Sequence, residues 1–246
     1  MVERNKIVSY VNEYLQIADF KDYGPQGVQV EGKKEVKKIF TGVSASAQLF
    51  EKAADQHADM IIVHHGILWN REMPIIKGGY KRRLSTLLHN DITLLAYHLP
   101  LDKHPEIGNN ALAARAFGLT DLTEFAEVGW MGDISLCSFD VLLKKVRDLY
   151  KSDPLVFAYG PEQVSRIGIC SGGAQRAISE AIEHGLDVYI TGEAAEPTMH
   201  LAKEAGIHFI SAGHYATERL GVRALGDHLA EKFDVQVEFI DIPNPV

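Results

Sequence analysis

Short hydrophobic runs alternate with amphipathic stretches along the first half of the chain. The runs are bounded by polar residues or glycine, as is typical of buried strands, and they cover residues 38–43 (KIFTGV), 60–63 (MIIV) and 92–97 (ITLLAY). Residues 46–57 place apolar side chains on one helical face behind Ser46, a good N-cap, and residues 109–117 predict a helix that ends at Gly118. This order predicts βαβ units in a mainly parallel sheet.

The second half of the chain repeats this scheme. Strands are expected at residues 166–170, 188–191, 208–211 and 235–241, and helices at residues 173–184, 197–205 and 217–232. Each half also has the same succession of strand, small-residue turn, helix and strand, in TGVSAS…IIVHHG and again in ICSGGA…VYITGE. An old duplication would explain this rhythm, and so would two βαβ units of independent origin.

The pattern therefore predicts an α/β protein made of two similar, closely packed domains with mainly parallel sheets. Residues 122–133 show only weak periodicity, which places the domain boundary near residue 125, to within about ten residues. The expected domains are residues 1–125 and 126–246, and the last strand is a candidate to cross back into the first domain.

Composition narrows the class of protein. Hydrophobic residues make up 46% and charged residues 24% of the chain, which are ordinary globular values. The net charge of −8 argues against nucleic acid and anionic membranes as partners. No uncharged apolar run is long enough to span a membrane, no secretory signal is recognisable, and Cys137 and Cys170 are the only cysteines. We expect a cytoplasmic protein.

His64 and His65 directly follow the buried strand MIIV and precede Gly66. In an open α/β sheet the carboxyl ends of the strands form the edge that binds ligands. Adjacent strand residues point to opposite faces, so this pair suits two ions better than one. The alternative is a pair of hydrogen-bonded histidines at the edge of the core.

His98 and Asp102 follow the next strand, in the segment HLPLD. Pro100 and Pro105 predict a stiff extended loop here rather than a helix, at the same sheet edge as the histidine pair. Asp102 could instead cap the helix that follows. Asn109 and Asn110 lie nearer to the start of that helix and can cap it, which favours a ligand role for Asp102.

In the second half, the strand HFIS runs into His214, with Glu218 four positions further on. On a helix these two side chains lie on one face about one turn apart, where they can bind one ion or bridge two. An ordinary surface His–Glu pair is the alternative.

Together these residues offer three imidazoles and two carboxylates at strand ends: His64, His65, Asp102, His214 and Glu218. Such a set suits a divalent ion such as Zn, Fe, Mn or Ni. It exceeds what one four-coordinate catalytic zinc needs, and it fits two ions, about 3.5–4 Å apart, that share Glu218 and a bridging water.

The sequence resembles the family of GTP cyclohydrolase I type 2 homologues, also called the NGG-interacting-factor-like family, and in particular its short bacterial YbgI branch. Gln26 is a departure, because an Asn is common there in the family. The resemblance covers essentially the whole chain, and its motifs are YGPQGVQVEGK (23–33), TGVSAS (41–46), VHHG (63–66), YHLPLDKHPEIGNN (97–110), ITGE (190–193), SAGHYATE (211–218) and FIDIPNP (239–245).

The resemblance implies a dinuclear metal centre between two α/β domains, with the same five ligands, and a ring-shaped homohexamer. It implies hydrolysis of GTP to dihydroneopterin triphosphate and formate, so the expected partner is a small-molecule substrate, GTP or another phosphorylated compound. His98 and Glu193 lie in family motifs close to the ligands, which makes them candidates for proton transfer or for holding a ligand in place. Structural positioning alone is the alternative for both.

Other readings stay open. A metal hydrolase of phosphoesters or amides would use the same ligands, and a non-enzymatic metal-handling or regulatory interaction protein would need no substrate. Ser171–Gly173 could hold a phosphate at a helix start, but it lacks the full P-loop pattern and its lysine, so a tight strand–helix turn is the favoured interpretation. Lys81–Arg83 and Arg219 are further, weaker candidates for an anionic substrate.

Overall fold

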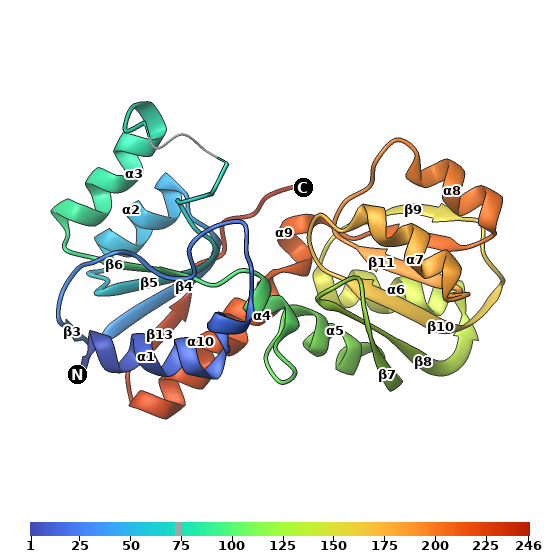
Figure 1. Ribbon diagram of the computed structural model, residues 1–246, viewed down its shortest axis with the longest axis horizontal. Helices are drawn as coiled ribbons and strands as arrows, with labels where there is room; N and C mark the ends of the chain where they lie inside the picture. Colours follow the sequence, from blue (N-terminus) through green and yellow to red (C-terminus); the bar gives the residue numbers. More distant parts are fainter. Residues whose placement is uncertain (72–74) are drawn as a thin grey trace. The chain divides into compact units, whose positions relative to one another are not determined.

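The chain forms two compact units in a computed structural model that describes residues 1–71 and 75–246 (Figure 1). Unit 1 comprises Met1–Leu101 and Gly221–Ile242, and unit 2 comprises Asp102–Leu220 and Pro243–Val246. The first division falls before residue 102, upstream of the position near residue 125 that weak periodicity predicts. The last strand does return to unit 1, and most of the preceding helix returns with it.

The sheet of unit 1 has five strands in the order β13-β4-β5-β6-β2. These strands are β13 (Gln236–Phe239), β4 (Lys38–Ser44), β5 (Met60–His65), β6 (Thr93–Ala96) and β2 (Gly27–Val30). All neighbours pair in parallel except β2, which runs antiparallel to β6 at the edge. A small separate sheet pairs β1 (Val2–Glu3) with β3 (Glu35–Val36).

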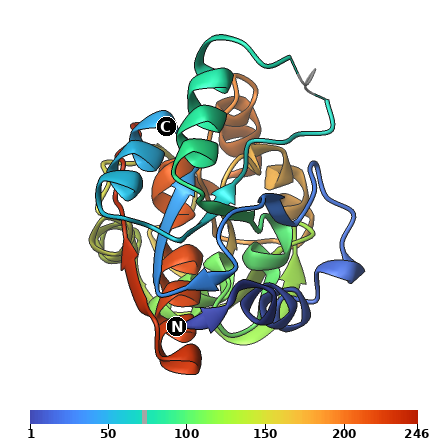
Figure 2. The same cartoon turned by 90° about the vertical axis from the view of Figure 1, so that its left-hand side faces the viewer.

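Helices cover both faces of this sheet (Figures 1 and 2). They are α1 (Arg4–Tyr14), the 3-10 turn η1 (Ile17–Asp19), α2 (Ala47–Asp55), α3 (Gly78–His89) and α10 (Arg219–Phe233). Leu49 and Phe50 of α2 and Leu87 of α3 are fully buried in one core cluster with the central strands. Ser46 caps α2 as predicted, since its Oγ accepts a hydrogen bond from Leu49 N at 3.2 Å.

The sheet of unit 2 has six strands in the order β7-β8-β10-β11-β12-β9. These strands are β7 (Thr120–Phe125), β8 (Gly129–Ser138), β10 (Gln163–Cys170), β11 (Val188–Thr191), β12 (His208–Ser211) and β9 (Leu155–Ala158). Only β10, β11 and β12 are parallel. The sheets are therefore mixed, and the mainly parallel arrangement holds for unit 1 but not for unit 2. The β7–β8 hairpin occupies the weakly periodic region that the sequence marks as a boundary.

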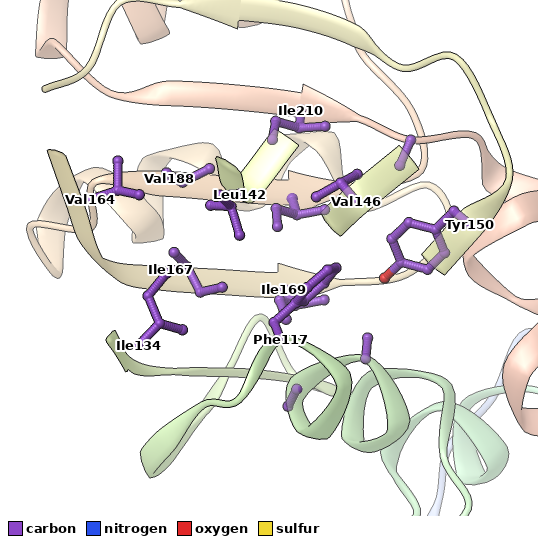
Figure 3. Packing of buried hydrophobic residues seen from close by; sticks show 14 of the residues in the cluster. Phe117, Ile134, Leu142, Val146, Tyr150, Val164, Ile167, Ile169, Val188 and Ile210 are labelled. Atoms are coloured by element: carbon purple, nitrogen blue, oxygen red, sulfur yellow. The ribbon is translucent and has the colours of Figure 1, made fainter. Parts of the chain in front are cut away.

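The helices of unit 2 are α4 (Leu99–Lys103, which begins in unit 1), α5 (Asn109–Phe117), α6 (Phe139–Tyr150), η2 (Gln175–Ala177), α7 (Ile178–Glu183), α8 (Thr198–Ala205) and α9 (His214–Thr217). Figure 3 shows the core on the face that α5 and α6 cover, where Phe117, Leu142 and Val146 pack against Ile169 of β10. The single helix predicted at residues 173–184 is divided into η2 and α7.

The two units share part of their topology. In each, three parallel strands follow one another along the chain, and an earlier strand pairs antiparallel with the third, as β2 does with β6 and β9 with β12. Details agree as well. Asp59, just before β5, accepts hydrogen bonds from the N–H groups of Lys37 and Lys38, and Asp187, just before β11, accepts them from Ser165 and Arg166. The two units therefore share this hydrogen-bond pattern at the start of the second parallel strand.

The carboxylate of Asp59 makes a testable contribution to the stability of unit 1. Burial raises its pKa, but hydrogen bonds from Lys37, Lys33 and Lys38 outweigh burial and lower the pKa below its usual 3.8. A lowered pKa means that the stabilisation is present above about pH 4 and is lost as the pH falls through the folded-state value. We expect Asp59→Asn to lower the free energy of unfolding by about 1 kcal/mol at pH 7.

Urea unfolding measured from pH 7 to pH 2.5 checks this. The difference between wild type and variant should shrink on acidification, and Asp55→Asn, an exposed carboxylate at the end of α2, serves as control. A difference that does not depend on pH would contradict the assignment.

Among the described helices, none has the length and hydropathy that a membrane span requires.

Candidate metal centre

In unit 1, three imidazoles gather where parallel strands end. His64 and His65 are the last residues of β5, and His98 comes two residues after β6. The ring centroid of His64 lies 4.7 Å from that of His65 and 4.9 Å from that of His98, and one nitrogen of each ring lies within 4.8 Å of the other two. His64 is fully buried, and its Nδ1–H donates to Tyr97 O at 3.0 Å. This bond places the lone pair of His64 on Nε2, the usual tautomer of a histidine ligand.

His98 is held by a carboxylate that sequence reasoning missed. Asp22, whose side chain is 2% exposed, accepts a hydrogen bond from His98 Nδ1 at 2.7 Å. Burial raises the pKa of Asp22. Its hydrogen bonds with His98 and with the Tyr23 and Leu99 N–H groups lower the pKa by a larger amount, so the net shift is downward. Asp22 lies in a loop far from His98 in sequence, and no local pattern marks it. Gln26, the departure from the family pattern, holds the backbone of His98 by accepting its N–H at 2.7 Å.

The segment HLPLD forms the short helix α4 and not the extended loop that its prolines predict. Pro100 falls in the first turn, where a missing N–H and a fixed φ are tolerated. Asp22 supplies the cap, because its Oδ2 accepts the Leu99 N–H at 2.9 Å. The prediction was wrong because this cap comes from a distant part of the chain.

In unit 2, His214 begins α9 and lies between two carboxylates. Its Nε2 is 3.1 Å from Glu218 Oε1, and its Nδ1 is 2.6 Å from Glu193 Oε1. Burial alone would lower the pKa of His214, but the hydrogen bonds and charges of Glu218 and Glu193 outweigh burial and raise the pKa to about 9. Glu193 thus holds His214 as Asp22 holds His98, through Nδ1, and each of the two histidines follows a parallel strand, β12 or β6.

Asp102 is buried in unit 2 with a defined set of donors. Ser171 Oγ and Asn109 Nδ2 both donate to its Oδ1, at 2.8 and 2.9 Å. Its carboxylate also offers an oxygen within 4.8 Å of one from Glu218, which is 2% exposed. Asn109 and Asn110 therefore do not cap α5 as expected. The N-cap is Gly108, and the Asn110 side chain donates to Val128 O at 3.0 Å.

Residues 2–245 match the family described as Duf34/NIF3 (NGG1p interacting factor 3). The chain belongs to this family. It is 45% identical over 251 residues to the GTP cyclohydrolase 1 type 2 homolog of Escherichia coli (strain K12), covering 99% of this chain and 100% of that protein. The protein of the same name from Pseudomonas aeruginosa is 46% identical over 246 residues and 97% of each chain.

Solved structures of relatives show the same fold. Protein ybgI, described as of unknown function, is 45% identical and superposes with a TM-score of 0.95 over 100% of both chains. TTHA1606 from Thermus thermophilus is 37% identical, with a TM-score of 0.94 over 100% of both chains. Reduced HcgD from Methanocaldococcus jannaschii, at 23% identity, a TM-score of 0.88 and 98% coverage of each chain, shares the fold. The family resemblance seen in the sequence is therefore confirmed.

The remaining candidates for anion binding already have partners within the protein. At the Ser171–Gly173 turn, Ser171 N donates to Asn110 Oδ1 at 2.7 Å and Gly172 N to Thr217 Oγ1 at 3.0 Å, which favours a tight turn over a phosphate cradle. Arg82 pairs with Glu51 at 2.7 Å, and Arg83 donates to Ala45 O at 2.9 Å. Arg219 donates to Tyr150 O.

Taken unit by unit, the donors fit divalent metal ions. Unit 1 offers only imidazole nitrogens in its cluster, whereas unit 2 offers one imidazole and buried carboxylates. Imidazole and carboxylate together suit Zn, Fe, Mn and Ni. These clusters of histidine and acidic residues could bind metal ions.

Proposed function

We propose that the chain is a metal-dependent hydrolase with two divalent ions, held by ligands from both units: His64, His65, Asp102, His214 and Glu218. The observation that carries the proposal is that several of these side chains are held in place by hydrogen bonds to neighbouring groups. The Nδ1 of His64 is bound to a carbonyl, the Nδ1 of His214 to Glu193, and one oxygen of Asp102 to two donors. Hydrogen bonds of this kind orient metal ligands and fix the tautomer of a histidine ligand.

When bound, the ions would supply an activated water and a positive clamp for developing negative charge. The chain's own residues would do the rest. Glu193 would keep the Nδ1 proton of His214 in place, and Ser171 and Asn109 would keep Asp102 in one rotamer. His98, with Nδ1 bound to Asp22, would exchange a proton through Nε2 beside the other two imidazoles.

A cavity in unit 2 favours an enzyme over a metal-handling protein. It has a volume of about 690 Å³, within the range of small-molecule sites, and Glu193 and Gly213 are part of its wall. The cavity therefore reaches the residues on either side of His214. The relatives' names suggest GTP as substrate, and the proposed centre would equally serve phosphoester or amide hydrolysis.

The first test is metal analysis of purified wild-type protein, with turnover of GTP measured on the same samples before chelation, after chelation and after metal is added back. About two ions per chain, with formate release that follows metal content, would establish the cyclohydrolase. Two ions without GTP turnover would keep the centre and direct a screen to phosphoesters and amides. Ions that exchange rapidly with chelator, without any turnover, would support metal handling instead. No stoichiometric metal would refute the proposal.

The pairing of Asp22 with His98 gives a separate prediction. In Asp22→Asn, an NH2 group replaces one of the two oxygens that accept from His98, Tyr23 and Leu99, and the negative charge beside His98 is lost, so the ring of His98 is held less firmly. We expect kcat to fall about 10- to 100-fold, with KM and metal content unchanged. Steady-state kinetics and metal analysis check this, with the exposed Asp19→Asn as control. A parallel loss of metal would instead make His98 a ligand.

The ring-shaped homohexamer implied by the resemblance is part of this proposal. Sedimentation equilibrium at micromolar concentration tests it, and a monomer at the concentration of the activity assay would refute it.

A further inference from the structure

We propose that Tyr23 and Trp69 form a stacking platform for a flat heteroaromatic ring of the substrate, beside the histidines of unit 1. This inference rests on the proposed function, because it adds a substrate-binding element to the same site.

Both rings flank His98. The centroid of Trp69 lies 5.4 Å from that of His98 at an interplanar angle of 90°, and that of Tyr23 lies 5.9 Å from it at 63°. Trp69 also lies 6.0 Å from His65. Both aromatic rings therefore meet His98 edge to face rather than stacked flat on it. An aromatic face beside an imidazole cluster is suited to receive a planar ligand.

The two loops that carry these rings are fastened to each other. Asn70 N donates to Tyr23 O at 2.8 Å, and Asn70 Nδ2 donates to Asp22 O at 3.1 Å. Gly24 packs so closely that a Cβ there would lie 2.4 Å from Leu68 O and 3.5 Å from the Trp69 ring. Any larger residue at position 24 would push the loops apart. The rings are thus held in place before a ligand arrives, which lowers the entropic cost of binding.

The exposure of these side chains argues against a purely structural role. Tyr23 is 57% exposed and Trp69 is only partly buried, so neither side chain is part of the buried hydrophobic core. Large aromatic side chains with accessible faces bind nucleobases by stacking with little regard to the base, because every base has a π-face. The ligand class that fits is therefore a purine-like ring, with GTP and ATP expected to bind similarly through this element.

The test uses tryptophan fluorescence of the metal-loaded protein, because the chain has only two tryptophans, Trp69 and Trp130. In the Trp130→Phe variant, Trp69 is the sole reporter, and we expect saturable quenching by GTP and by ATP but none by inorganic triphosphate. In Trp69→Leu, the remaining Trp130 packs against the hydrophobic core of unit 2 and should not respond. Calorimetric titration should show binding of both nucleotides weakened about 5- to 100-fold in Tyr23→Leu and in Trp69→Leu.

Tyr23→Phe keeps the ring and should restore affinity, and Tyr159→Leu removes an exposed tyrosine of unit 2 as a matched control. Metal content should be unchanged in all of these variants. The platform is refuted if triphosphate binds as well as the nucleotides, if neither nucleotide quenches Trp69, or if the two leucine variants bind like wild type. If any of these results is obtained while metal content and turnover are normal, the platform is refuted but the proposed hydrolase is not. Wild-type protein without stoichiometric metal would refute the proposed hydrolase itself.

Discussion

Glu218→Ala and His64→Ala are each expected to lose stoichiometric metal and all metal-dependent turnover. Under the proposal, Glu218 is shared by two ions, so its removal affects both, and His64 supplies a fully buried imidazole. Loss of a ligand should cost more than the roughly 10- to 100-fold in affinity that follows the loss of an outer partner. Elemental analysis and formate release, measured on the same preparations, check the expectation.

Two surface variants serve as matched controls. Glu196→Ala removes a carboxylate of unit 2 whose side chain is 86% exposed, and His89→Ala removes an exposed imidazole of unit 1. Both should retain metal and activity. Full metal content in Glu218→Ala, in a protein whose circular dichroism matches wild type, would remove Glu218 from the ligand set. Loss of metal in Glu196→Ala would indicate a general effect of charge.

Gly172→Ala is expected to disturb the same centre without changing a proposed ligand. A Cβ at position 172 would lie 2.3 Å from Glu218 Oε1, closer than real contacts allow. The buried carboxylate would have to move away from His214, to which it is bonded. The residue also has φ +69°, a left-handed conformation that disfavours any side chain. Metal affinity should fall by at least about 10-fold, the scale of a disturbed ligand.

The second effect in this variant, backbone strain, can be measured separately. Gly185 in unit 2 has φ +62°, and a Cβ there would meet nothing within 4 Å. Gly185→Ala should therefore lose about 1 kcal/mol of stability and keep its metal. Chemical unfolding measures the backbone strain in both variants, and metal titration measures the displacement of Glu218, which only Gly172→Ala should show. Equal metal affinity in the two variants would show that Glu218 tolerates the added methyl group.

The repeated topology relates these sites to one another. The strand pairs β4–β5 and β10–β11 carry the equivalent residues Asp59 and Asp187 at their starts, and in both units the third parallel strand is followed by a histidine, His98 or His214, whose Nδ1 is bound to a carboxylate. A duplicated βαβ unit would begin with chemistry at the same sheet edge in both copies, because carboxyl ends of parallel strands converge there. Under the duplication hypothesis, later divergence would account for the imidazole cluster of one unit and the carboxylates of the other.

The parallel strands at the core of each unit, and the candidate ligands that follow them along the chain, could be predicted from local sequence patterns alone. Runs such as MIIV and VYIT form strands because continuous apolar segments are stable only when buried on both faces. Histidines directly after such a run lie at the sheet edge by chain geometry alone, so His64 and His65 could be placed there without coordinates.

Elements that depend on partners far away in the sequence could not be predicted in this way. In the β7–β8 hairpin, most residues of β7 are exposed, so the sequence shows little hydrophobic periodicity there. The hairpin forms because β8 also pairs with β10, a strand distant in sequence. Helix α4 forms because Asp22, from a distant loop, caps it, and the same carboxylate holds His98. Local patterns report which residues are buried, whereas hydrogen bonds between remote segments depend on how the chain folds back, which no short window of sequence contains.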